Sequence, residues 1–171
     1  MTQLPDAEQL VCDLTRRIES YRVQQSRTAP CALVGIHTGG AWLAEKIGKM
    51  LGAALPLGTL DISFYRDDFD RIGLHPGAKP SHIPFEVDGC HIILIDDVLN
   101  TGRTVRAAMN DLFDYGRPAS ISLAVMIDRG GRELPVAARF VGIVLDLEPG
   151  RNIQLERGED GRLSLSLKEG K

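Results

Sequence analysis

Two adjacent carboxylates and a hydroxyl-rich turn are the residues best suited to chemistry in this chain. Asp96 and Asp97 follow an apolar run at residues 91–95, and the turn Thr-Gly-Arg-Thr occupies residues 101–104. The turn opens a helical pattern, so its free backbone N–H groups and the positive helix end can hold a phosphate dianion. The carboxylates can accept hydrogen bonds from sugar hydroxyls and attract hydrated magnesium. The pattern predicts a ligand with a phosphate at one end and a diol beside it.

A second glycine-rich turn, Thr38-Gly39-Gly40, follows another apolar run at residues 31–36. In an open α/β sheet, ligands bind beyond the carboxyl ends of the strands, which is where the acidic pair and this turn both fall. We therefore expect the acidic pair and the turn at residues 38–40 to face one crevice.

Other phosphate-handling folds also end a buried strand in aspartate. A Walker B strand needs a Gly-x-x-x-x-Gly-Lys-Ser/Thr loop elsewhere, and the sequence contains none. A receiver domain carries its acidic pair near its start, whereas this pair lies past the midpoint of the chain. A loop with a purely structural role would not need the carboxylates and the Thr-Gly-x-Thr turn together, so a binding function is favoured.

Helices and strands that alternate along the chain must position these turns. Apolar residues at helical spacing predict helices, and continuous apolar runs predict buried strands. The expected helices span residues 6–24, 41–51 and 103–115, and the expected strands span 31–36, 57–64, 91–95, 121–127 and 140–147, with an edge strand in the tail at 163–167. This order indicates an α/β fold with a mostly parallel central sheet flanked by helices. Residues 66–84, rich in glycine and proline, are expected to form a flexible lid loop.

Composition places the chain among ordinary globular domains. Its 171 residues are 43% hydrophobic and 25% charged, which fits a single domain over residues 1–171. The net charge of -3 offers no bulk attraction for nucleic acid, and no stretch is apolar and long enough to cross a membrane, so a cytoplasmic location is expected. The three widely spaced cysteines suit reduced, packed thiols. The four histidines show no metal-ligand spacing.

Residues 92–104, Ile-Ile-Leu-Ile-Asp-Asp-Val-Leu-Asn-Thr-Gly-Arg-Thr, resemble the signature of type I phosphoribosyltransferases. Segments at 35–40, 61–68, 116–119 and 128–135 are similar to one branch of that family, the pyrimidine-operon regulators with uracil phosphoribosyltransferase activity (PyrR type). The similarity covers roughly residues 10–145. It implies the type I phosphoribosyltransferase fold, with a small hood at about residues 126–135 and the lid at about residues 66–84.

The resemblance also implies a role for each part of the site. The ribose and 5-phosphate of 5-phosphoribosyl-1-pyrophosphate (PRPP) would be bound by Asp96, Asp97, Val98, Leu99, Asn100, Thr101, Gly102, Arg103 and Thr104. The pyrophosphate would meet Thr38, Gly39 and Gly40. Arg66 in the lid would neutralise charge that develops on pyrophosphate, unless it pairs with Asp67 or Asp68 instead. Uracil would be read, mainly by backbone groups, at Met126, Ile127, Asp128, Arg129 and Gly130. Mg2+ would bind mainly through the substrate, with Asp96 and Asp97 as candidate protein ligands.

The implied reaction joins uracil to PRPP and gives uridine monophosphate (UMP) and pyrophosphate. An oxocarbenium-like state of this kind needs charge compensation and exclusion of water more than a nucleophilic side chain. Two alternatives stay open: a regulator that senses uridine nucleotides and binds a stem-loop in pyrimidine messenger RNA, and a phosphoribosyltransferase for hypoxanthine or orotate, against which the hood sequence argues. The family implies homodimers or homotetramers.

The residues that the resemblance assigns to RNA contact are only partly present. Matching residues are Thr15, Arg16, Thr38 and Arg132. Departures at these positions are Gly131 for a usual histidine, Ala137 for an arginine and Ile143 for a lysine. Outside the RNA contacts, Gly39 replaces a frequent basic residue of the pyrophosphate loop, and Asn100 replaces a frequent tyrosine of the signature loop. Each basic residue that faces phosphate adds affinity through counterion release. The sequence therefore predicts weak RNA binding.

Overall fold

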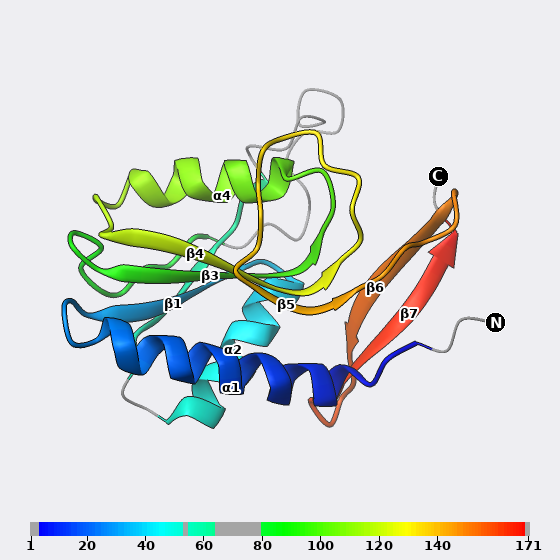
Figure 1. Cartoon of the computed structure of the whole chain (residues 1–171), viewed down its shortest axis with the longest axis horizontal. Helices are drawn as coiled ribbons and strands as arrows, with labels where there is room; N and C mark the ends of the chain where they lie inside the picture. The colour runs from blue at the N-terminus through cyan, green and yellow to red at the C-terminus, as the bar shows by residue number, and fades with distance from the viewer. Residues whose placement is uncertain (1–3, 53–54, 64–79, 170–171) are drawn as a thin grey trace.

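The computed structural model describes residues 4–52, 55–63 and 80–169, and the chain folds around one parallel sheet (Figure 1). The strands lie in the order β2-β1-β3-β4-β5, and each neighbouring pair is parallel. Their bounds are β1 Cys31–Ile36, β2 Leu57–Leu60, β3 His91–Leu99, β4 Ser120–Asp128 and β5 Phe140–Val144. The central position of β3 brings the acidic pair to the middle of the sheet.

Helices cover both faces of this sheet, with α1 and α2 on one face and α4 on the other (Figure 1). They span Ala7–Gln25 (α1), Gly39–Leu51 (α2) and Arg103–Phe113 (α4). The side chains of β3 alternate between the two cores: Ile93 and Ile95 pack with α1 and α2, and Ile92 and Leu94 pack with α4. Because both faces are buried, the strand is apolar at successive positions. The α/β fold with a parallel central sheet is confirmed.

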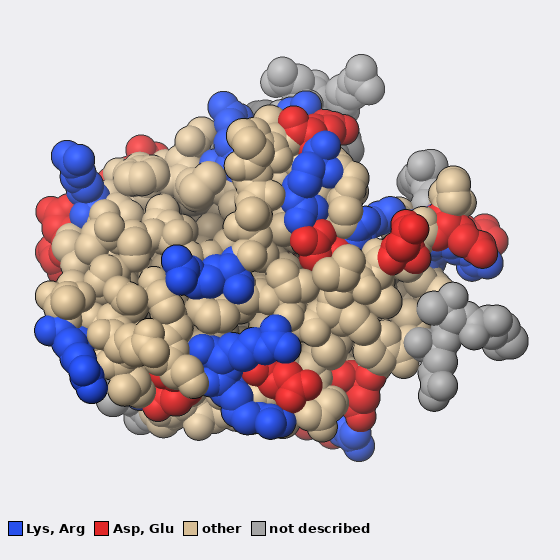
Figure 2. Space-filling model, viewed as in Figure 1, with Lys and Arg blue, Asp and Glu red and all other residues tan. Residues whose placement is uncertain are grey.

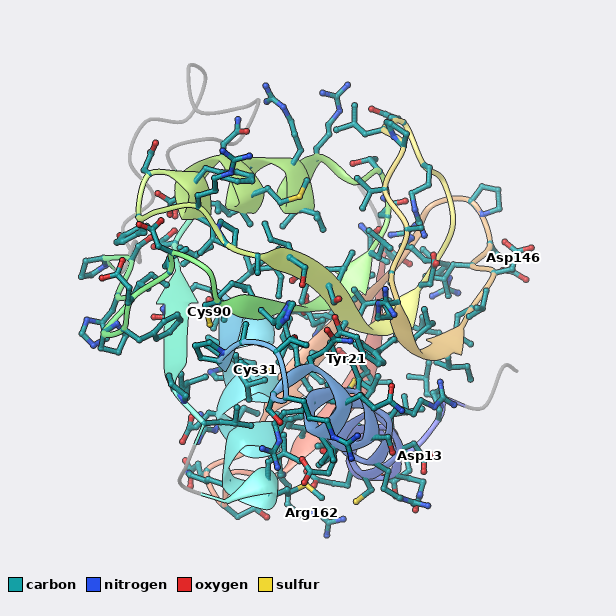
Figure 3. All side chains as sticks on the ribbon, turned by 60° about the vertical axis from the view of Figure 1, so that its left-hand side comes forward. Asp13, Tyr21, Cys31, Cys90, Asp146 and Arg162 are labelled. Carbon is teal, nitrogen blue, oxygen red and sulfur yellow. The ribbon has the colours of Figure 1, made fainter. Side chains whose placement is uncertain are left out.

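Helix α1 is fixed near both of its ends. At its start, the Asp6 carboxylate accepts a hydrogen bond from the backbone N–H of Glu8 at 2.8 Å, as an N-cap does. Near its end lies Tyr21, which is labelled in Figure 3. Its ring packs edge-to-face on that of Phe140, with the centroids 5.4 Å apart. The Tyr21 hydroxyl also accepts a hydrogen bond from Ser122 at 3.0 Å. These contacts hold α1 against β4 and β5.

The C-terminal residues form a separate antiparallel hairpin of β6 (Arg151–Arg157) and β7 (Leu163–Glu169), which projects from the central sheet (Figure 1). Glu8 on α1 anchors the hairpin, because its carboxylate accepts a hydrogen bond from the backbone N–H of Leu163 at 2.7 Å and also pairs with Lys46 of α2. The tail strand expected at residues 163–167 therefore exists, but its partner is β6. Residues 151–157 were not predicted as a strand.

Several element ends differ from the sequence expectations. The strand expected at 57–64 is assigned as far as Leu60, and the strand expected at 140–147 ends at Val144. The helix expected to start at residue 41 begins at Gly39. The predicted lid lies outside the described residues except for residues 80–84.

The cysteines are packed as free thiols. Cys31 and Cys90 are buried and Cys12 is partly exposed, and none forms a disulfide. Burial raises the pKa of Cys90 to about 11, and the neighbouring Cys31 adds to the rise. The packed-thiol prediction is confirmed. In the described part of the chain, no helix has both the length and the apolar character needed to span a membrane.

Candidate active site

The acidic pair lies within β3. The sequence predicted a strand ending at residue 95, but pairing with β4 continues through Asp96, Val98 and Leu99. The Asp96 carboxylate accepts a hydrogen bond from the backbone N–H of Asp97 at 3.0 Å, and the Asp97 carboxylate accepts one from the N–H of Val98 at 2.9 Å. Asp96 is buried and Asp97 is partly exposed. The backbone thus fixes both carboxylates at the carboxyl end of the central strand.

The turn after β3 presents the N-terminus of α4. Gly102 has a φ of 91°, a left-handed conformation that glycine adopts without strain, and its carbonyl accepts the N–H of Arg106 at 3.0 Å. The Thr101 hydroxyl accepts the backbone N–H of Arg103 at 3.2 Å. The first turn of α4 contains no acidic residue that would repel an anion. This geometry suits the phosphate that the sequence places at residues 101–104.

The glycine-rich turn at residues 38–40 lies directly against the acidic pair. A Cβ atom added to Gly39 would come within 2.6 Å of Asp97 Cγ, and one added to Gly40 would come within 2.9 Å of Asp96 Cα. Both glycines begin α2, whose first turn also lacks an acidic residue. The peptide bond between residues 37 and 38 is cis. The turn at residues 38–40 and the acidic pair are therefore neighbours at one edge of the sheet.

The segment expected to form the hood begins at the end of β4, beside the turn at residues 101–104. The side chains of Met126 and Ile127 are fully buried in the core, so they support the hood from within the sheet. The hydrogen bond from Arg132, joined by one from the backbone N–H of Gly130 at 3.0 Å, lowers the pKa of Asp128 although burial opposes this. Residues 128–130 are partly exposed, so they are the part of this segment that lies outside the core.

A polar network links α4 to both ends of the segment at residues 64–79. Asp111 is buried on α4 and accepts a hydrogen bond from the Ser81 hydroxyl at 2.9 Å, and that hydroxyl accepts the backbone N–H of Asp61 at 2.9 Å. Burial raises the pKa of Asp111, and the charges of Asp114 and Asp61 raise it further. Arg66, which the sequence assigned to the lid, lies outside the described residues.

Sequence reasoning missed this network, although a signal was present. Asp111 falls next to Leu112 and three residues after Ala108, on the apolar side of the predicted helix. A carboxylate in that position must find hydrogen-bond donors when it is buried. Its partners come from a segment about thirty residues earlier, which spacing alone does not reveal.

The residues matched to RNA contacts differ in exposure. Thr15 is buried, and its hydroxyl donates to the Val11 carbonyl at 2.7 Å. The Arg132 guanidinium donates hydrogen bonds to the backbone carbonyls of Val136 and Asn100. Arg16 is exposed and pairs with Asp13 at 2.9 Å. On the face drawn in Figure 2, the described lysines and arginines form separate groups, several beside acidic residues.

Comparison with known proteins gives a consistent assignment. The family described as "Phosphoribosyl transferase domain" matches residues 2–153. A protein of Nitrosococcus oceani named "Bifunctional protein PyrR" is 52% identical over 145 residues, which cover 84% of this chain and 81% of the relative. A protein of the same name from Pseudomonas syringae is 48% identical, and the match covers 95% of each chain.

A solved structure supports the same fold. A hypoxanthine phosphoribosyltransferase from Staphylococcus aureus is 16% identical and superimposes with a TM-score of 0.65 over 90% of this chain and 81% of its own length. At this identity the likeness concerns the fold alone. The parallel sheet, with its acidic pair beside a glycine-rich turn, agrees with the sequence matches. These matches show that this chain belongs to the phosphoribosyl transferase domain family and, within it, to the PyrR-type proteins.

Proposed function

We propose that this chain transfers the phosphoribosyl group of PRPP to uracil, giving UMP and pyrophosphate. The observation that carries this proposal is the meeting of three elements at one edge of the sheet: the acidic pair Asp96–Asp97, the phosphate turn at residues 101–104 and the turn at residues 38–40. Each element matches one part of PRPP. Family membership and the PyrR-type relatives support the same reaction.

Each part of the site would bind one part of the substrate. The N–H groups at the start of α4 would hold the 5-phosphate, and Asp96 and Asp97 would accept hydrogen bonds from the ribose hydroxyls. The turn at residues 38–40 would receive the pyrophosphate leaving group at the start of α2. Positive charge that develops on the ribose would then lie near the carboxylates, which lowers the energy of an oxocarbenium-like state.

Magnesium fits this site as an ion carried by the substrate. Within residues 4–52, 55–63 and 80–169, no three His, Cys, Asp or Glu side chains gather into a metal-binding group. Asp96 and Asp97 nevertheless supply neighbouring carboxylate oxygens, the ligand type that Mg2+ prefers. When bound, the ion would neutralise charge on the leaving pyrophosphate.

Replacing the acidic pair tests the assignment of the site. The double variant Asp96→Asn, Asp97→Asn is expected to bind PRPP with magnesium at least tenfold more weakly, because two charged acceptors for the ribose hydroxyls are lost. Isothermal titration calorimetry measures this directly. Asp13→Asn, on the exposed side of α1, is the control and should bind PRPP as the wild type does. Unchanged affinity in the double variant would refute the assignment.

RNA attenuation is a second function, which the resemblance to pyrimidine-operon regulators implies, and the surface argues that it is weak here. Thr15 and Arg132 are engaged inside the protein, and Ala137 and Ile143 carry no charge. With few cations facing phosphate, both affinity and its dependence on salt should be low. Filter binding of a pyrimidine-operon stem-loop over a salt series checks this. Tight, sequence-selective binding that UMP enhances would show that RNA regulation is the main function.

A further inference from the structure

The hood is hydrogen-bonded to three successive backbone carbonyl groups that lead into the phosphate turn. The donors are Arg129 N–H to Leu99 at 3.0 Å, Arg132 Nη1 to Asn100 at 2.9 Å, and the N–H groups of Glu133 and Leu134 to Thr101 at 3.0 and 3.1 Å. A side-chain pair, Arg103 with Glu133 at 2.7 Å, lies beside them. The segment expected to read the base and the loop expected to hold the phosphate are thus joined over consecutive residues.

These hydrogen bonds determine the direction of the N–H groups in the turn. A trans peptide is planar, and its N–H points opposite to its C=O. When the carbonyls of Leu99, Asn100 and Thr101 face the hood, the N–H groups of the next three residues are directed away from it. The last of those three is Gly102, at the start of α4. The hood contacts therefore orient the donors on which phosphate binding depends.

Arg132 is the side chain that spans these parts. Its guanidinium donates to the Asn100 carbonyl at 2.9 Å and to the Val136 carbonyl at 3.0 Å, and it forms an ion pair with Asp128. Three-quarters of the side chain is shielded from solvent, with a relative exposure of 25%. A planar guanidinium presents its donors from three nitrogen atoms in one rigid fork, whereas the three donors of an ammonium group radiate from a single nitrogen atom. One residue thus connects the phosphate turn, the end of β4 and the segment after the hood.

Two departures from the family pattern meet at the same place. A Cβ atom added to Gly131 would come within 2.7 Å of Asn100 Oδ1, and Gly131 has a φ of 72°. The glycine therefore leaves room for the Asn100 side chain in a backbone conformation that other residues rarely adopt. Gly131 and the Asn100 side chain therefore lie against each other, next to the hydrogen bond from Arg132 to the Asn100 carbonyl.

We propose that Arg132 is a positioning residue that orients the phosphate turn from the base-binding hood, and that it does not serve as an RNA contact in this chain. The proposal rests on the PRPP-binding function proposed above. Arg132 and its neighbours connect the two substrate subsites, the phosphate turn and the base-binding hood, by hydrogen bonds. Replacing Arg132 should therefore weaken the binding of PRPP, even though the contacts of its guanidinium are with protein acceptors.

Two variants test the proposal by PRPP binding in the presence of magnesium. Arg132→Ala removes the guanidinium, and Arg132→Lys keeps a charge that cannot span the three acceptors. Both are expected to bind PRPP about tenfold more weakly or worse, and to raise the KM for PRPP more than they lower kcat. Added guanidinium ion should restore the affinity of Arg132→Ala, whereas methylammonium should not. Arg157→Ala, which removes the ion pair between the C-terminal hairpin and Glu45 of α2, is the control with wild-type affinity.

Wild-type PRPP affinity in Arg132→Ala would overturn the proposal, and so would a loss that guanidinium ion fails to restore in a folded variant. If Arg132→Ala does not fold, wild-type affinity in Arg132→Lys overturns the proposal in its place. Loss of stem-loop binding with PRPP affinity retained would assign the residue to RNA instead. A wild-type chain that binds PRPP without forming UMP would contradict the proposed reaction but leave this binding test valid.

Discussion

Replacing Gly39 with alanine tests whether Asp97 must occupy its observed position. The added Cβ would lie 2.6 Å from Asp97 Cγ and 2.9 Å from Asp97 Cβ. Carbon atoms pack at about 3.5–4.0 Å, so Asp97 must move by roughly 1 Å, and because its Cβ atom is part of the clash, its backbone must shift as well. The φ of Gly39 is not positive, so its backbone can accept alanine, and the expected loss of stability from the overpacked contact is about 1–3 kcal/mol.

The same displacement of Asp97 should also lower the rate of catalysis. A misplacement of about 1 Å at a reacting group can lower the rate by about 100-fold. We therefore expect kcat/KM for PRPP to fall by about 100-fold in Gly39→Ala, while the protein stays folded. Initial rates of UMP formation, measured over a range of PRPP concentrations, give this value, and thermal unfolding checks the fold.

A second glycine of the same helix provides the control. A Cβ on Gly48 would meet Leu33 Cδ1 at 3.6 Å, which is ordinary contact. Gly48→Ala should keep full activity and gain about 0.5–1 kcal/mol of stability from the better helix former. Wild-type kcat/KM in Gly39→Ala would refute the reasoning, because it would show that the position of Asp97 beside this turn is not required.

Three further changes have defined outcomes. Glu8→Ala should lower the free energy of unfolding by about 1–3 kcal/mol in a denaturant titration, because it removes a charged acceptor from the backbone N–H of Leu163; a loss below this range would contradict the anchoring role. Burial raises the folded-state pKa of Asp111, so its contribution to stability is present below the unfolded pKa and is lost as pH rises through the folded value. Asp111→Asn should therefore make stability fall less between acidic and neutral pH than in the wild type, and an identical pH profile by thermal unfolding would contradict this. Gly131→His should lose about 1–2 kcal/mol of stability, because a φ of 72° disfavours a side chain and Asn100 fills the space; full stability in denaturant would show that the turn rearranges freely.

Continuous apolar runs and local motifs made much of the fold and site predictable. Residues 31–36 form β1 as expected, since a strand buried on both faces is apolar throughout. The acidic pair and the turn at residues 38–40 were expected to meet, because the carboxyl ends of parallel strands lie at one edge of a sheet. The contact of Gly39 and Gly40 with Asp97 and Asp96 agrees with that expectation.

Features that depend on pairing between distant segments could not be read from local patterns. β3 continues through Asp96 because β4 pairs with it there, and polarity alone suggested that the strand had ended. The hairpin of β6 and β7 depends on cross-strand partners and on Glu8, near the other end of the chain. The direction of the Arg132 guanidinium is set by acceptors on three segments of the chain, whereas the resemblance had assigned this residue to RNA contact.

Nucleotide formation from a panel of bases tests the proposed reaction most directly. The protein would be incubated with magnesium, PRPP and each of uracil, hypoxanthine, guanine and orotate, and the nucleotide and pyrophosphate formed would be measured. We predict UMP and an equal amount of pyrophosphate from uracil, and no comparable product from the other bases. Product from a purine or from orotate but not from uracil, or no product from any base under conditions in which PRPP binds, would contradict the assignment.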